Sequence, residues 1–330
     1  MRILFWGTPD FAVPSLRALV GEGFEIVAVV TQPDRPAGRG RRLTPSPVNQ
    51  AALEEGLTVL TPDRPRGEEF LSLIRDLRPE VSVVVAYGHI LSREVLDVPR
   101  LGSVNLHSSL LPELRGAAPI NWAIARGYEE TGVTVMRMVE AMDAGPIIHQ
   151  AAEPILPDET AGELTLRLSE VGAAVLVEAL ALLSMDAVEE VEQDDEAATF
   201  APKIDRTTAR IDWNRPALEI ANHIRAMDPA PGAWTTLDDL PVKLYRPDVL
   251  TAAVSAESGA ESGTSGNGAD PLARASVPGK VLAAEPSEGV VVAAGTDRVL
   301  IREVQPPGSR RMAAADWING RGVSVGQTFE

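Results

Sequence analysis

Two polar side chains of this sequence are spaced so that they can act on one reacting atom. Asn105 and His107 end a short stretch, residues 102–107, that is predicted to form a β-strand. Side chains two positions apart on a strand point to the same face, so the amide and the imidazole can both donate hydrogen bonds to one oxyanion. Imidazole can also carry a proton near neutral pH. Taken alone, an Asn-x-His pair is more often a satisfied polar pair, so the neighbouring residues must decide.

The residues that follow favour chemistry over a purely structural role. A proline-fixed apolar turn comes directly after the pair and is suited to seat a flat organic group beside the two donors. Further along, Asp143 lies in a glycine-bearing turn after the predicted strand 132–139. A carboxylate there can orient His107 or accept a proton, although Asp is also an ordinary turn residue. The apolar turn consists of Ser109, Leu110, Leu111 and Pro112.

Two other kinds of site are disfavoured. A dinucleotide-binding fold places Gly-x-Gly-x-x-Gly after its first strand, whereas here only Gly7 is present and Thr8 and Pro9 follow it. The four histidines form no His-x-x-x-His pair and the chain has no cysteine, so we expect no metal site. The lack of cysteine also excludes disulfides.

The candidate residues must be positioned by a sheet, and the pattern indicates a mostly parallel one. Over residues 1–185, runs rich in Val and Ile alternate with helical stretches, which is typical of a Rossmann-like α/β domain. Such sheets bind ligands at the carboxyl ends of their strands, where His107 is expected. The predicted strands span residues 2–6, 24–31, 80–86, 102–107 and 132–139, and the predicted helices span 11–20, 46–56, 67–77 and 161–183.

A second, smaller domain is expected after a linker. Seven acids and no base lie between Asp186 and Glu196, which predicts an exposed linker over residues 186–204. Residues 205–330 hold one predicted helix and a run of short strands, which is typical of a small β-barrel or sandwich. Residues 253–270 are rich in Gly, Ser, Ala and Glu and are expected to form a flexible inserted loop. The predicted helix spans 216–227, and the strands span 234–237, 242–249, 277–284, 289–293 and 298–304.

The overall charge argues against nucleic acid as a general partner, with one local exception. The 330 residues carry a net charge of −17, which repels phosphate. Residues 32–44 nevertheless contain one acid, Asp34, and four arginines. This loop follows the carboxyl end of a predicted strand on the same sheet edge as His107, so it can reach over the site. A solvated loop is the ordinary interpretation of such a segment, but the concentration of positive charge in an acidic chain keeps a contact to nucleic acid open. The arginines are Arg35, Arg39, Arg41 and Arg42.

Targeting and membrane signals are not expected in this sequence. The apolar run at the start of the chain ends at Gly7, which is too short for a signal peptide. No apolar run approaches the ~20 residues that cross a membrane. We therefore expect a cytoplasmic protein. As a separate expectation, the protein acts as a monomer.

Longer motifs carry a resemblance to a known family. Asn105-x-His107 is followed by the 109–112 turn, by Arg115-Gly-Ala-Ala-Pro119 and by Asp143-x-Gly145. Together these resemble the folate-dependent formyltransferases and, within that family, the members that formylate methionyl initiator tRNA. The similarity runs nearly from end to end, apart from residues 253–270. Further matching motifs are residues 7–11, 32–40, 45–47, 200–204, 211–213 and 231–234.

The resemblance implies an activity, a cosubstrate and a role for each candidate residue. It implies formyl transfer from 10-formyltetrahydrofolate to the α-amino group of methionyl initiator tRNA, without a metal. Asn105 and His107 would hold the oxyanion, Asp143 would orient His107, and the turn formed by Ser109, Leu110, Leu111 and Pro112 would contact the folate. The second domain would be an OB-like barrel that helps to hold tRNA.

The resemblance also implies which cations contact tRNA. Arg39 is the expected main contact, and Arg41, Arg42 and Lys203 are expected to assist. Arginine is suited to this role because it can grip a phosphate with two hydrogen bonds or bind guanine.

Two positions of this sequence depart from the family pattern. Position 108 is Ser where relatives usually have Gly or another residue, and Glu113 stands where relatives usually carry a base. An acid at position 113 does not help to bind a nearby phosphate.

A formyltransferase acting on a small amine, such as an amino sugar nucleotide or glycinamide ribonucleotide, would need neither the arginine loop nor the second domain. A non-catalytic RNA-binding module would use the three polar residues only structurally.

Overall fold

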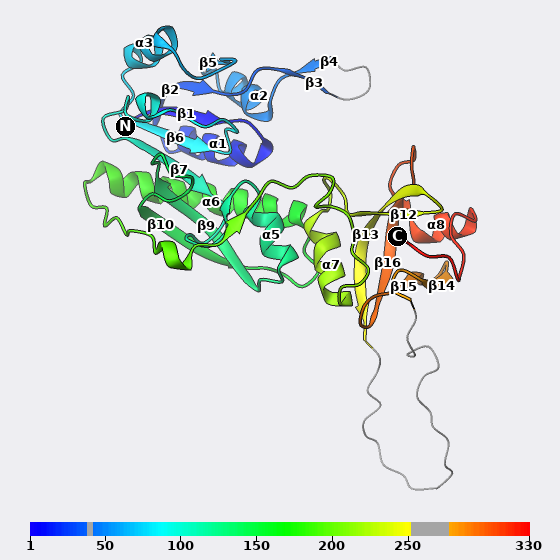
Figure 1. The fold of residues 1–330 in the computed structure, drawn as a ribbon. Helices are drawn as coiled ribbons and strands as arrows, with labels where there is room; N and C mark the ends of the chain where they lie inside the picture. Colours follow the sequence, from blue (N-terminus) through cyan, green and yellow to red (C-terminus); the bar gives the residue numbers. More distant parts are fainter. Residues whose placement is uncertain (38–41, 252–276) are drawn as a thin grey trace, which may run out of the picture. The chain divides into compact units, whose positions relative to one another are not determined.

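The computed structural model describes residues 1–37, 42–251 and 277–330, which form two compact units. The first comprises residues 1–120, 129–156 and 163–203, and the second comprises residues 121–128, 157–162 and 204–330. Both contain strands and helices (Figure 1). The insertion predicted at 253–270, together with Arg39 and Arg41, lies outside the described residues.

The sheet of the first unit is mostly parallel, as predicted, and has seven strands in the order β10-β9-β7-β6-β1-β2-β5. Strands β1, β2, β5, β6 and β7 run parallel, whereas β9 and β10 are antiparallel to their neighbours. The antiparallel strand β10 was not predicted. The strands are β1 Arg2–Gly7, β2 Glu25–Val30, β5 Val59–Leu60, β6 Val81–Val85, β7 Ser103–His107, β9 Glu130–Arg137 and β10 Ile147–Pro154.

Helix α2 of this unit begins where the sequence provides a start signal. Helix α2 begins at Pro47, and the side chain of Ser46 accepts a hydrogen bond from the Asn49 backbone N–H at 3.0 Å. This is the expected N-cap with proline in the first turn. The other helices are α1 Val13–Gly21, α3 Glu68–Asp76, α4 Arg93–Leu96 and α6 Ala161–Ser184, and a 3-10 turn spans Asp10–Ala12.

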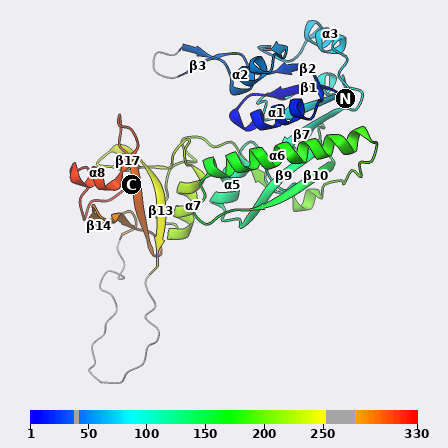
Figure 2. The same cartoon turned by 180° about the vertical axis from the view of Figure 1, so that it is seen from behind.

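The core of the first unit lies on both faces of the sheet. On one face, Trp6 and Val84 pack with apolar residues of α3 and α4. On the other, α6 runs across the sheet (Figure 2). A Cβ at Gly172 of α6 would come within 2.8 Å of Leu106 of β7, so glycine permits this close approach between helix and strand. Burying both faces agrees with the uninterrupted apolar runs of the strands.

The second unit holds an antiparallel sheet, in the order β12-β13-β16-β15-β14 with β17 paired to β16. The short helix α8 and strand β17 were not predicted. Stacked aromatic rings of Trp213, Trp317 and Phe329 form part of its core. The elements are α5 Pro119–Ala125, which begins in the first unit, α7 Ala217–Ala226, β12 Trp234–Leu237, β13 Leu240–Leu250, β14 Val281–Glu285, β15 Gly289–Ala293, β16 Arg298–Gln305, β17 Met312–Ala313 and α8 Ala314–Asn319.

The last residues of the chain connect the two outer strands of this sheet. Thr236 of β12 exchanges two backbone hydrogen bonds with Glu330, at 3.0 and 3.1 Å. The backbone N–H of Val281 in β14 donates to the carbonyl of Gln327 at 2.8 Å. The final segment therefore supplies backbone partners to both edges, which a sheet otherwise leaves unpaired.

Candidate active site

Asn105 and His107 lie at the carboxyl end of β7 in the first unit, with their side chains on one face of the sheet. The register pairs Asn105 with Val84 of β6, and Val84 with Trp6 of β1. Residues paired across a parallel ladder point the same way, so Asn105 and His107 share the face of Trp6. The carboxyl edge of a parallel sheet is where ligands of such folds bind.

The two side chains differ in how their polar atoms are occupied. His107 is 6% exposed, and its Nε2 lies 3.0 Å from the carbonyl oxygen of Leu114. A carbonyl can only accept, so Nε2 carries the hydrogen and donates. The half-buried amide of Asn105 has no hydrogen-bond partner among the described residues. It therefore remains available as a donor to a ligand.

Asp143 faces the imidazole from the turn after β9. Its Oδ2 lies 3.8 Å from His107 Nδ1, which is close enough for an ion pair but longer than a hydrogen bond. The same oxygen accepts the backbone N–H of Gly116 at 2.8 Å. Asp143 has a positive φ of 51°, a conformation that Asp tolerates better than most residues. The structure thus brings His107 and Asp143, 36 positions apart in the chain, to one place.

The 109–112 turn is held together mainly by its own residues and by β9. The Ser109 hydroxyl donates to the carbonyl of Glu113 at 2.6 Å, and the Ser109 carbonyl accepts from the Thr134 hydroxyl at 2.6 Å. Thr134 also accepts the backbone N–H of Leu111 at 3.1 Å. The hydroxyl and carbonyl of Ser109 and the N–H of Leu111 are therefore occupied, whereas Leu110 and Pro112 are partly exposed. What the turn offers a ligand is chiefly its apolar surface.

Residues 191–201 contact this site, although the sequence suggested only an exposed linker. Strand β11 (Phe200–Ala201) pairs with β8 (Arg115–Gly116). The Thr199 hydroxyl accepts the backbone N–H of Leu114 at 2.8 Å. The backbone N–H of Ala117 donates to the carbonyl of Ala201 at 2.9 Å. This segment supports the loop that presents the Leu114 carbonyl and the Gly116 N–H to the catalytic candidates.

Gln193 is the residue of this segment that sequence reasoning missed. Its side-chain oxygen accepts two hydrogen bonds from the Arg115 guanidinium, at 2.8 and 3.0 Å. Its side-chain nitrogen lies 2.9 Å from the Asp143 carbonyl and 2.7 Å from the Gly145 carbonyl. The available signal was that Gln193 is the only uncharged polar residue among the acids at 189–196.

The arginine loop begins at the same sheet edge and contains a two-stranded hairpin. Strand β3 (Arg35–Ala37) pairs with β4 (Arg42–Thr44). Arg35 donates to the Gln32 side chain, which donates in turn to the Tyr87 carbonyl at 2.9 Å. Tyr87 follows β6, so the base of the hairpin is attached at the carboxyl edge that carries His107.

The other predicted tRNA contacts among the described residues are Arg42 and Lys203. Arg42 belongs to β4 by its backbone, and Lys203 is exposed at the end of the first unit. Glu113 is also exposed, and its side chain has no partner among the described residues.

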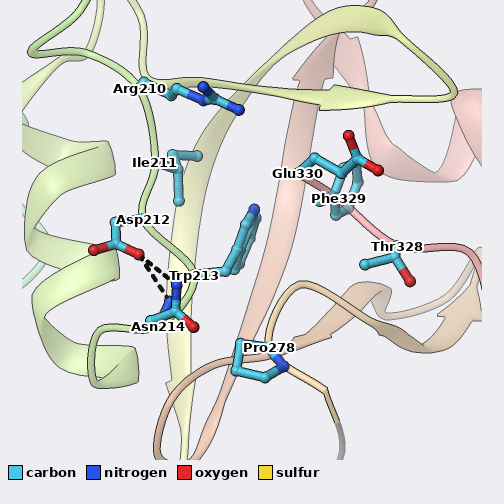
Figure 3. A pocket seen from close by; sticks show the side chains of 9 residues that line it. All are labelled: Arg210, Ile211, Asp212, Trp213, Asn214, Pro278, Thr328, Phe329 and Glu330. Carbon is cyan, nitrogen blue, oxygen red and sulfur yellow. Dashed lines mark hydrogen bonds between the residues drawn. The ribbon is translucent and has the colours of Figure 1, made fainter.

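Features elsewhere are less suited to the predicted chemistry. Within the described residues, no group of His, Cys, Asp and Glu could hold a metal ion, and no helix is long and apolar enough to cross a membrane. The second unit has a pocket of about 470 Å³ beside Trp213 (Figure 3). Among its lining residues, the Asp212 carboxylate accepts from Asn214 at 3.0 and 3.1 Å. This pocket lacks a histidine.

Solved structures of similar fold are formyltransferases and a larger protein. The sugar 3N-formyl transferase WlaRD matches with a TM-score of 0.64 and 16% identity, over 94% of this chain and 99% of WlaRD. HypX from Aquifex aeolicus, crystallised with tetrahydrofolic acid, matches with a TM-score of 0.62 and 17% identity. That match covers 98% of this chain but only 48% of HypX, so this chain spans about half the length of HypX. At these identities the likeness establishes the fold alone.

Sequence comparison extends over the full length at much higher identity. The chain is 46% identical to methionyl-tRNA formyltransferase of Symbiobacterium thermophilum, over 100% of this chain and 95% of the relative. It is 41% identical to methionyl-tRNA formyltransferase of Bacillus subtilis, over 99% of this chain and 97% of the relative. The family profile described as formyl transferase matches residues 1–180, and that of the formyl transferase C-terminal domain matches residues 203–322. This chain therefore belongs to the formyl transferase family.

Proposed function

We propose that this protein transfers the formyl group of 10-formyltetrahydrofolate to the α-amino group of methionine on initiator tRNA, in support of translation initiation. The observation that carries the proposal is the 41–46% identity to proteins named methionyl-tRNA formyltransferase, which extends over both family regions. The HypX structure with tetrahydrofolic acid supports a folate as the cosubstrate. The proposed site of transfer is the carboxyl edge of β7.

The amine needs little activation near neutral pH. A free α-amino group titrates at ~7.7–8.0, and an ester in place of the carboxylate withdraws electrons and lowers this pKa further. A substantial fraction of the amine is therefore uncharged and nucleophilic without a strong base. The catalytic demand falls instead on the negative charge of the formyl oxygen and on the departing folate nitrogen.

Asn105 is proposed to stabilise the negative charge that develops on the formyl oxygen. Its side-chain amide is half-buried and has no hydrogen-bond partner among the described residues, so its N–H can donate to the formyl oxygen as charge develops there. Donors that are oriented before the reaction, in a site that excludes water, stabilise such charge effectively.

The contact with Leu114 refines the proposed role of His107. Because Nε2 donates to the Leu114 carbonyl, Nδ1 is the ring nitrogen that can serve the reaction. When Nδ1 is protonated it can donate to the formyl oxygen or deliver its proton to the departing folate nitrogen. Asp143, 3.8 Å from Nδ1, stabilises the charged ring and can take the proton that the amine loses. The new bond joins the amine nitrogen to the formyl carbon, and the bond from that carbon to the folate nitrogen breaks.

The remaining contacts divide between folate and tRNA. The turn of Ser109, Leu110, Leu111 and Pro112 supplies an apolar wall for the folate, with Leu110 and Pro112 partly exposed. Arg39, Arg41, Arg42 and Lys203 bind the tRNA, with Arg39 as the main contact. We place the residues 1–185 in a catalytic domain, 186–204 in a linker, and 205–330 in a tRNA-binding domain.

Residues 205–330 are proposed to form an OB-like barrel that helps to hold the tRNA. Its support is the segment at Gln327–Glu330, which hydrogen-bonds to both outer strands of the antiparallel sheet, as a barrel requires. We further propose that the protein acts as a monomer in the cytoplasm.

A comparison of acceptors tests the proposed function. The purified protein is assayed with 10-formyltetrahydrofolate and either methionyl initiator tRNA, an amino sugar nucleotide or glycinamide ribonucleotide. We expect rapid formylation of the tRNA alone. Faster transfer to either small amine would assign the chain to another branch of the family, and tRNA binding without transfer would support a non-catalytic role.

The arginine loop is tested separately, by binding. Arg39→Ala should weaken tRNA binding and reduce its dependence on salt, because one phosphate contact is lost. Arg64→Ala is the matched control, since Arg64 is an exposed arginine in the first unit. Equal affinity of the Arg39 variant and its parent at low salt would rule out this contact.

A further inference from the structure

We infer that Gln193 is a positioning residue for Asp143, so that a residue of the acidic segment 186–196 takes part in the reaction indirectly. The inference rests on the proposed function for the role of Asp143. The Gln193 side-chain nitrogen donates to the carbonyls of Asp143 and Gly145, at 2.9 and 2.7 Å. These two carbonyls belong to the turn that carries the carboxylate, so the amide group holds the backbone of that turn.

The other end of the same amide holds the partner of the carboxylate. The Gln193 oxygen accepts from Nε and Nη2 of Arg115, at 3.0 and 2.8 Å. Arg115 is 6% exposed and precedes Gly116, whose backbone N–H donates to Asp143 Oδ2 at 2.8 Å. One side chain therefore connects the turn that carries the carboxylate with the loop that donates to it.

The surroundings fix Gln193 in turn. Val191, two residues earlier, exchanges backbone hydrogen bonds with Ile147 of β10 at 2.8 and 2.9 Å. Asp195, two residues later, lies 2.8 Å from the Arg115 guanidinium. The half-buried amide is thus anchored on both sides along the chain. An anchored segment can transmit position, whereas a solvated linker cannot.

The chemistry of the site requires an amide at position 193. Its oxygen must accept from a guanidinium while its nitrogen donates to two carbonyl oxygens, and only a primary amide does both at this length. Gln193→Glu keeps the acceptor toward Arg115 but places a second oxygen against the carbonyls of Asp143 and Gly145. Gln193→Leu removes both sets of contacts without adding charge. Comparing the two variants therefore separates the contact with Arg115 from the contact with the Asp143 turn.

The first test measures steady-state formyl transfer by the full-length protein with methionyl initiator tRNA and 10-formyltetrahydrofolate. Both Gln193→Glu and Gln193→Leu should lower kcat ~10- to 100-fold, because small displacements of catalytic groups cost this much. KM for both substrates should stay within about threefold, since the substrate contacts are unchanged. Glu192→Gln, at the exposed neighbouring position, is the control and should behave as the parent does. Parent-like kcat for Gln193→Glu would overturn the inference.

A double-mutant cycle separates positioning from general structural support. If Gln193 acts through Asp143, adding Gln193→Leu to Asp143→Asn should lower kcat by less than about threefold. A full additional loss in that background would overturn the inference. Thermal unfolding of each variant reports whether the fold is kept, and Gln193→Glu remains decisive if Gln193→Leu unfolds.

A substrate-free measurement keeps the inference separate from the proposed function. If the parent protein itself formylates no methionyl-tRNA, the proposed function fails. The ¹⁵N chemical shifts of the His107 ring then compare the parent with Gln193→Glu. They should change, because displacement of Asp143 alters the surroundings of Nδ1. Identical shifts would overturn the inference.

Discussion

The Nε2 atom of His107 lies 3.0 Å from the carbonyl oxygen of Leu114, and this contact determines which ring nitrogen can take part in the reaction. A neutral imidazole has one donor nitrogen and one acceptor nitrogen. With the donor engaged by Leu114, the acceptor nitrogen Nδ1 faces Asp143. His107 is thereby prepared to receive a proton on Nδ1 before it can donate one, which makes Asn105 the donor that is available throughout the reaction.

Replacing Asn105 tests this division of roles. Asn105→Ala should lower kcat ~10²- to 10³-fold, the usual cost of losing one oxyanion donor. The free energy of unfolding should change little, because the amide has no hydrogen-bond partner among the described residues. Steady-state formyl transfer and urea unfolding measure the two effects. A kcat within a few-fold of the parent would remove Asn105 from the mechanism.

Replacing Asp143 by asparagine removes its charge while keeping an oxygen that can accept from Gly116. Asp143→Asn should lower kcat ~10²- to 10⁴-fold, the range for losing a group that moves or stabilises a proton. The matched control is Asp186→Asn, since Asp186 has a similar positive φ of 53° but is exposed. Stopped assays on both variants give the comparison. Similar losses in both would show that the effect is not specific to the carboxylate beside His107.

Thr134 is expected to be the main internal support of the 109–112 turn. Its buried hydroxyl donates to Ser109 and accepts from the Leu111 N–H and the Gln150 side chain. Thr134→Val should reduce the free energy of unfolding by ~2 kcal/mol, because buried polar groups lose their partner. Thr134→Ser keeps the hydroxyl and serves as the control. Urea unfolding measures both, and equal stability of the two variants would contradict this role.

Strand periodicity was sufficient to predict that Asn105 and His107 share a face at the carboxyl end of a parallel strand. It could not predict that Asp143 faces them, because nothing in local spacing relates a turn to a strand end 36 residues earlier. That expectation came from the family motifs. The proximity itself depends on the antiparallel pairing of β7 with β9, which is set by tertiary packing.

The structural features that the sequence pattern did not predict have weak local sequence signals. Strand β10 lies at the edge of the sheet, and its sequence at 147–154 mixes apolar residues with His149, Gln150 and Glu153 without strict alternation. The acidic segment indicated solvent exposure, and most of it is exposed. Gln193 was missed because its partners are backbone carbonyls and an arginine far away in sequence, which composition does not reveal.

Tyr87 should make stability sensitive to alkaline pH. Burial raises the pKa of Tyr87 to about 12, above the ordinary value of about 10. The unfolded chain therefore loses this proton first, so the stability that Tyr87 provides is complete below pH ~10 and is lost as the pH rises towards ~12. In Tyr87→Phe, urea unfolding should show a smaller loss of stability between pH 9 and pH 11 than in the parent, by ~1 kcal/mol. An equal loss in both proteins would assign the sensitivity to other groups.

Substituting Glu113 tests whether tRNA binds beside this residue, because the substitution should strengthen the binding. It is exposed, without a side-chain partner among the described residues, and lies two positions before Arg115 at the candidate site. If tRNA phosphates pass this loop, Glu113→Arg replaces a repulsive charge with an attractive one. The tRNA affinity should rise ~10-fold at low salt, and the slope of log K against log salt should steepen by about one. Glu94→Arg, at an exposed acid on α4, controls for net charge. Filter binding over a salt series measures both variants, and an equal gain in the two would mean that the improvement reflects overall charge and not a phosphate beside residue 113.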